Sequence, residues 1–271
     1  METDHDRPQI IALDLLSAFR QPGCPLCRIR QQAADRYLFG LLWENMGNMS
    51  VRQKLAESLG FCPEHTWQLE HLAAAEFAGE TGTSILYSEI VHHVLERLRT
   101  LEASLPDDPP VSRRQKEQVR HRVRAQTPVQ SCPVCADVAA AEERNMHWLI
   151  AGCPDPVFRA RYAASDGLCL SHLSRVVEAA AITDPNAAHF FVRLAILKGE
   201  TLIANLDGYV RKRAWEHRLE AIEPDEQNAA CRAARFLGGL GEQDKTEIRR
   251  QRQTDAVSIA GLKEKGLRID E

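Results

Sequence analysis

One short pattern, written twice, constrains this chain more than any other feature: a CxxC pair followed at long distance by CxxH. The interval is 35 positions from Cys27 to Cys62 and 34 from Cys135 to Cys169. Three thiolates and one imidazole can close a tetrahedral Zn²⁺ shell. The sequence therefore predicts two zinc ions per chain, each held within one copy of the pattern. The ligands are Cys24, Cys27, Cys62 and His65 in the first copy, and Cys132, Cys135, Cys169 and His172 in the second. A pseudo-twofold arrangement would instead allow Cys24 and Cys27 to be completed by Cys169 and His172.

Each pair is expected to begin a helix. Proline follows Cys24, Cys62 and Cys132 directly, and proline is favoured at the first helical position, where its missing N–H costs nothing. Each of these cysteines is then the residue before the helix, and the second ligand of its pair lies in the first turn. The positive end of the helix dipole favours thiolate over thiol there. Each predicted site joins two helix starts.

The repeat extends beyond the ligands. An offset of 108 places Cys24 on Cys132, and an offset of 107 places Gly60 on Gly167. Abundant Ala, Leu, Glu, Arg and Gln, with little alternation of period two, predicts helices throughout. We expect them at about 9–20, 25–45, 50–59, 63–78, 83–105, 112–126, 133–151, 156–164, 170–182, 186–216 and 225–237. The predicted fold is all-α, with two pseudo-repeated lobes at 1–108 and 109–221, then a C-terminal helix and charged tail at 222–271.

Two long helices carry apolar stripes. In the helix at 83–105, apolar residues recur at alternating spacings of 4 and 3, a seam that favours a partner helix. These residues are Tyr87, Val91, Val94, Leu98, Leu101 and Leu105. The helix at 186–216 has a second stripe from Phe190 to Val210, and Asp184-Pro185-Asn186 is a helix-opening sequence. We expect both stripes to be buried.

Composition limits the class of protein. A net charge of −4 gives no overall field that attracts nucleic acid or an anionic membrane. The first residues lack a basic segment followed by an apolar core, and no run approaches the roughly 20 apolar residues that span a bilayer. These features predict a soluble, cytoplasmic protein in which cysteines bind metal rather than form disulfides.

Alternatives remain for several residues. The Cys/His sets could hold an iron–sulfur cluster, act as exchanging dithiols, or be buried thiols and histidines without a ligand. Cys153 and Cys231 are interpreted as small buried residues outside the metal sites. The basic run from Arg113 to Arg124 lacks interleaved aromatics for stacking on bases, so a solvated helix face is favoured over a nucleic-acid contact.

The CPxC openings, the stretches GFCPEH and GLCLSH and the duplication resemble an uncharacterised bacterial domain-of-unknown-function family over most of residues 8–240. The resemblance implies a bacterial, cytosolic setting and supplies no reaction. Since no Gly-rich phosphate loop, HExxH or nucleophile elbow is present, a non-catalytic zinc scaffold for a protein partner or for self-association is favoured. An iron–sulfur or dithiol redox protein is the alternative.

Overall fold

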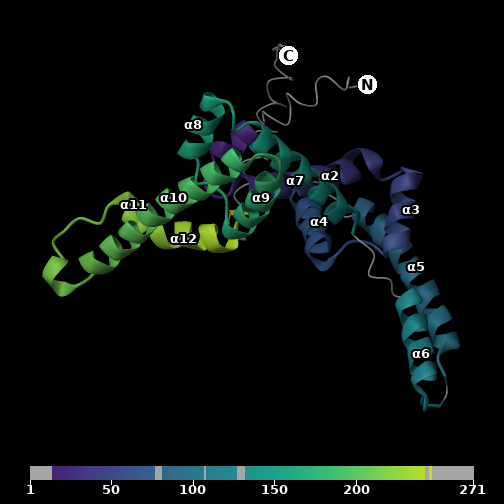
Figure 1. Cartoon of the computed structure of the whole chain (residues 1–271). Coiled ribbons are helices and arrows are strands. Elements are labelled where there is room, and N and C mark those ends of the chain that lie inside the picture. The colour runs from purple at the N-terminus through teal and green to yellow at the C-terminus, as the bar shows by residue number, and fades with distance from the viewer. Residues whose placement is uncertain (1–13, 77–80, 107, 127–131, 242–243, 246–271) are drawn as a thin grey trace, which may run out of the picture. The chain divides into compact units, whose positions relative to one another are not determined.

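A computed structural model of the protein describes residues 14–76, 81–106, 108–126, 132–241 and 244–245, and every regular element in these ranges is a helix (Figure 1). The predicted all-α class is confirmed. Residues 14–19 are helical and belong to the helix expected at 9–20, whose earlier part lies outside the described residues. The elements that follow are α2 (Pro25–Gly40), η1 (Leu41–Asn45), α3 (Met49–Ser58), α4 (Pro63–Glu76), α5 (Thr81–Ser104), α6 (Arg113–Gln126), α7 (Pro133–Ala151), α8 (Pro156–Ala164), α9 (Leu170–Thr183), α10 (Pro185–Lys212), η2 (Trp215–His217), α11 (Pro224–Gln227) and α12 (Ala229–Gly238).

Three expected helices differ in detail. The one expected at 25–45 changes at Leu41 to a π-helical turn, where the Asn45 side chain donates a hydrogen bond to the Gly40 carbonyl (3.1 Å). Such a side-chain bond to a helix carbonyl accompanies the local change in winding. The long helix α10 ends at Lys212 rather than 216, and the helix expected at 225–237 is divided in two at Asn228. The tail from residue 246 lies outside the described residues.

Local capping explains where α10 begins. Asp184 has a non-helical backbone, and its carboxylate accepts hydrogen bonds from the backbone N–H groups of Asn186 and Ala187 (3.0 and 3.2 Å). Pro185 occupies the first helical position, where it costs no hydrogen bond. The predicted opening of this helix is confirmed.

The chain divides into two compact units, and each is described here by itself. The first unit comprises residues 1–32 and 141–271, and the second comprises residues 33–140. These limits differ from the expected repeat boundaries at residues 108 and 221. The second unit includes the end of α2 and the start of α7. The boundaries of the units therefore differ from those of the predicted repeats.

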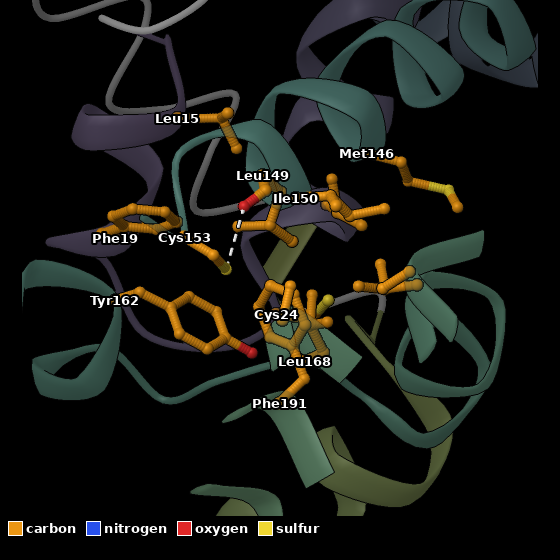
Figure 2. Packing of buried hydrophobic residues seen from close by; sticks show 14 of the residues in the cluster. Leu15, Phe19, Cys24, Met146, Leu149, Ile150, Cys153, Tyr162, Leu168 and Phe191 are labelled. Carbon is orange, nitrogen blue, oxygen red and sulfur yellow. Dashed lines mark hydrogen bonds between the residues drawn. The ribbon is translucent and has the colours of Figure 1, made fainter. Parts of the chain in front are cut away.

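The first unit has a continuous aromatic and aliphatic core (Figure 2). Phe191 of α10 is 1% exposed and meets Tyr162 of α8 edge to face, with ring centroids 5.3 Å apart. Phe19 also packs edge to face against Tyr162 (5.5 Å). The helices α9 and α12 pack against α10 in this unit. This core holds the starts of α2 and α9 in place.

The second unit buries a face of α5 different from the expected one. Thr83, Leu86 and Ile90 are buried, whereas Val91 and Leu98 of the predicted seam are 52% and 45% exposed. The prediction was wrong because α3 packs against α5 and lines one cavity with Leu86 and Ile90, whereas α6, which also packs against α5, buries none of its own residues. Parts of the α10 stripe are likewise exposed, at Leu197 and Val210.

Candidate metal centres

All four ligand pairs stand at helix starts, as the sequence predicts. The helices α2, α4, α7 and α9 begin directly after Cys24, Cys62, Cys132 and Cys169. The carbonyl of each of these cysteines accepts the first helical hydrogen bond, at 3.2, 2.9, 3.1 and 2.8 Å in that order. The second ligand of each pair therefore lies in the first turn, close to unpaired N–H groups that favour an anionic sulfur.

The grouping of these pairs differs from the primary prediction. The eight side chains form two sets of four, and each set joins a CxxC from one repeat with a CxxH from the other. Cluster one is Cys24, Cys27, Cys169 and His172; cluster two is Cys62, His65, Cys132 and Cys135. The predicted grouping within each repeat is wrong, and the exchanged arrangement is the observed one. Long-range packing decides this, because either grouping provides three thiolates and one imidazole.

Cluster one lies wholly within the first unit. The Nδ1 atom of His172 is 3.4 Å from Cys24 Sγ, 3.3 Å from Cys27 Sγ and 3.2 Å from Cys169 Sγ. The sulfurs of Cys27 and Cys169 are 3.7 Å apart. All but Cys27 are buried.

Cluster two lies wholly within the second unit and has nearly the same dimensions. The Nδ1 atom of His65 is 3.1 Å from Cys62 Sγ, 3.5 Å from Cys132 Sγ and 3.3 Å from Cys135 Sγ. The sulfurs of Cys62 and Cys135 are 3.7 Å apart. Here two of the three sulfur ligands, those of Cys62 and Cys135, are only partly buried.

These distances suit one tetrahedral ion. With Zn–S of about 2.3 Å and Zn–N of about 2.0–2.1 Å, tetrahedral edges are about 3.8 Å between sulfurs and about 3.6 Å between sulfur and nitrogen. In both clusters all four ligand atoms lie within 4.8 Å of one another. A cluster of several irons and sulfides holds its thiolates around a larger core, so such close ligand atoms favour a single ion. Either cluster could therefore hold a metal ion.

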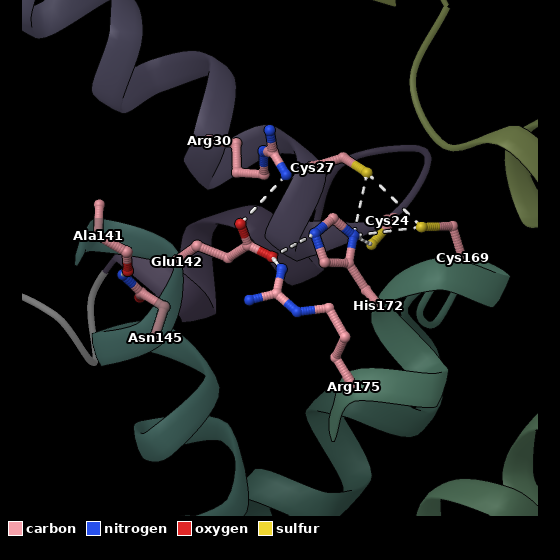
Figure 3. A network of polar contacts seen from close by, with 9 residues as sticks. All are labelled: Cys24, Cys27, Arg30, Ala141, Glu142, Asn145, Cys169, His172 and Arg175. Atoms are coloured by element: carbon pink, nitrogen blue, oxygen red, sulfur yellow. Dashed lines mark hydrogen bonds and ion pairs between the residues drawn. The ribbon is translucent and has the colours of Figure 1, made fainter. Parts of the chain in front are cut away.

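A carboxylate orients the histidine of cluster one (Figure 3). The Nε2 atom of His172 is 2.9 Å from Glu142 Oε1, so the ring donates from Nε2 and presents Nδ1 to the sulfurs. Glu142 is 3% exposed and also pairs with Arg30 (3.1 Å) and with Arg175. A hydrogen bond from the second ring nitrogen to a carboxylate is the usual support of a metal-binding histidine. The two arginines compensate for burying the carboxylate charge.

Cluster two has a related contact at the corresponding place in the sequence. Arg175 stands three positions after His172, and Gln68 stands three positions after His65. The side chain of Gln68 donates a hydrogen bond to the carboxylate of Asp35 (2.7 Å), which is 2% exposed. In both units, then, the side chain one turn after the histidine binds a buried carboxylate.

The groups of cluster one have pKa values shifted in opposite directions. Hydrogen bonds from Cys24 and Cys27 lower the pKa of Cys169 far below that of an ordinary thiol, whereas burial raises the pKa of Cys24. Burial opposes the charge of His172, but its contacts with Cys169, Cys27 and Glu142 prevail and raise its pKa to about 11. In cluster two, burial is the main cause that raises the pKa of Cys135 to about 12.

Sequence reasoning missed Glu142, because an acidic residue in mid-helix has no distinguishing pattern. It also treated Cys153 and Cys231 alike. Cys153 is 1% exposed and donates to the Leu149 carbonyl (3.5 Å; Figure 2), as its interpretation as a buried residue predicts. Cys231 is exposed, so the same interpretation is wrong there. Neither belongs to a metal-type cluster in the described part of the chain.

The fold and the paired clusters define an all-α protein with two candidate Cys₃His metal centres. The chain belongs to the family of unknown function DUF6062, which matches residues 7–211. It is also similar to an uncharacterised 23.9 kDa protein encoded in the xynA 3′ region of Caldicellulosiruptor sp. (strain Rt8B.4), with 21% identity over 234 residues, 83% of this chain and 99% of that protein. No solved structure matches the chain. No helix in the described residues is long and apolar enough to cross a membrane.

Proposed function

We propose that this protein is a zinc-binding helical scaffold whose two Cys₃His centres are structural and which binds a protein partner. The observation that carries the proposal is the placing of eight ligand atoms in two groups with tetrahedral edge lengths. Three thiolates and an imidazole suit Zn²⁺, and four protein ligands leave no coordination position for water or substrate.

The positions of the ligands in the chain support a structural role. In cluster one the CxxC pair stands at the start of α2 and the CxxH pair at the start of α9, more than 140 positions later. A bound ion would fix these two helix starts against each other. Structural zinc contributes about 10–16 kcal/mol of apparent binding free energy in zinc-finger peptides at pH 7, and such energy acts as folding energy where the site forms only in the folded state.

Metal analysis of protein purified without oxygen tests the proposal. We expect two zinc per chain, no visible absorbance, and a thermal transition that moves to lower temperature when a strong chelator removes the ions. Brown protein that contains iron and sulfide would instead support the iron–sulfur alternative. A thermal transition unchanged after both ions are removed would contradict the structural role.

Partner binding is supported by large apolar side chains on the surface. Trp43, Trp67 and Trp215 are 68%, 66% and 72% exposed. Tryptophan is enriched where proteins bind one another, and exposed apolar patches mark such surfaces. Light scattering of the purified protein would detect self-association, and affinity capture from a native lysate would detect another partner. The Trp43→Ser and Trp67→Ser variants should lose the contact if the second unit carries it.

A nucleic-acid partner is the less favoured alternative. The helix α6 buries none of its residues and is rich in arginine, so it presents a basic face. The rest of the chain more than offsets this charge, since the net charge is −4. A gel-shift titration with duplex and single-stranded probes would reveal salt-dependent binding if this face contacts phosphates.

A further inference from the structure

The residue that follows helix α12, Gly239, lies directly on cluster one. A methyl group added at Gly239 would stand 2.9 Å from Cys27 Sγ and 3.7 Å from Cys169 Sγ. Gly239 is buried, and its backbone (φ 80, ψ −154) is in a region open almost only to glycine. The backbone can therefore approach the two sulfurs only because residue 239 lacks a side chain.

Several contacts hold this segment in place. Leu240 lies over Gly23, because a methyl group added at Gly23 would be 2.7 Å from Leu240 Cδ2. The preceding helix α12 packs on α9 and α10, and Arg235 Nε donates to Asp244 (3.0 Å). We call residues 229–240 the C-terminal cover. It lies outside residues 7–211, the part of the chain that the family matches.

A small cavity beside the cover is lined by three cations and one carboxylate. Lys198, Arg232 and Arg235 line it together with Asp166 and with Cys24 and Cys169 of cluster one. A metal ion with three thiolates and a neutral imidazole carries a net negative charge, so nearby cations favour the bound state. Two of these cations belong to the cover, where Arg232 pairs with Asp225 and Arg235 with Asp244.

We propose that the C-terminal cover shields cluster one and makes its metal exchange more slowly than that of cluster two. The proposal rests on the proposed metal binding, but the shielding of the thiols can be tested separately. In cluster two both Cys62 and Cys135 are partly buried, whereas in cluster one only Cys27 is, and Gly239 lies close to its sulfur. Removing metal from cluster one requires the cover to move.

The test uses the full-length chain and the Gly239→Ala substitution. Gly238→Ala is the matched control, because a methyl group at 238 meets no atom within 4 Å. Leu240→Ala, which loosens the cover without a clash, is the second test variant. Each protein is treated with a chelator and pulsed with an isotope-coded maleimide, and peptide mass spectrometry reports the labelling rate of each cysteine. Total metal content is measured first.

In the wild type, Cys27 and Cys169 should be labelled more slowly than Cys62 and Cys135. Gly239→Ala should speed labelling of Cys27 and Cys169 by roughly five- to a hundredfold, from the usual cost of a forbidden backbone conformation. Leu240→Ala should act in the same direction and Gly238→Ala should not, with cluster two unchanged. The proposal would be overturned if Cys27 and Cys169 were labelled at equal rates in Gly239→Ala and Gly238→Ala. It would also be overturned if Gly239→Ala accelerated labelling of both clusters equally. Absence of metal from the wild type would overturn the proposed function instead, while labelling of the metal-free chain still tests the cover.

Discussion

The sulfur atoms of Cys27 and Cys169 lie 3.7 Å apart, although 142 positions separate the two residues in the chain. Each belongs to a different copy of the CxxC…CxxH pattern. Paired substitutions can test this grouping in solution. If metal binds as the geometry indicates, Cys24→Ser combined with Cys169→Ser removes only one ion, because both residues serve cluster one. Cys24→Ser combined with Cys62→Ser removes both ions. Mass spectrometry measures the metal content per chain. Loss of both ions in the first double variant and of one ion in the second would instead support the grouping within repeats.

Glu142→Gln should weaken metal binding at cluster one without removing a ligand. The substitution keeps the shape of the side chain but removes the negative charge that interacts with His172, Arg30 and Arg175. Loss of such an outer contact typically lowers metal affinity about 10- to 100-fold. Competition with a chromophoric chelator measures the affinity. Glu143→Gln, one position along and exposed, is the matched control and should leave both affinities unchanged.

Phe191→Ala should destabilise the first unit strongly. The side chain is 1% exposed and packs against Tyr162, so its removal leaves a cavity in the core. Such truncations cost about 3–5 kcal/mol. Leu197→Ala on the same helix is a suitable control, because Leu197 is 60% exposed and its loss should change the free energy of unfolding by less than about 0.5 kcal/mol. Denaturant unfolding of the metal-loaded proteins measures both, and similar values for the two would contradict the described core.

The two cysteines outside the clusters should react very differently with a thiol reagent. Cys231 is exposed and should be alkylated at once in the native protein. Cys153 is buried, and burial raises its pKa to about 11, so little thiolate exists near neutral pH and access is blocked. It should react only after unfolding. Intact-mass measurement of the metal-loaded protein should therefore show a single fast addition, and rapid labelling of Cys153 would show that the core opens readily.

Much of the fold could be predicted from the sequence because its signals are local. Proline after Cys24, Cys62 and Cys132 marks three helix starts, and Asp184 marks a fourth. Each depends on one or two neighbouring residues, so sequence patterns suffice. The buried face of α5 was not predictable in this way. Its apolar residues form more than one possible stripe along the helix. Packing against α3 determines that Leu86 and Ile90 are buried while Val91 and Leu98 are exposed.

The sequence by itself determined which residues form the candidate centres, since thiols and imidazoles at helix starts suit metal wherever the helices go. Only the tertiary structure decided that Cys27 stands with Cys169 rather than with Cys62. It alone also placed Glu142 behind His172 and Gly239 against the sulfurs. The reason is physical: a helix start is fixed by hydrogen bonds within a few residues. The long-range contacts of a side chain depend instead on packing between segments that are far apart in the chain.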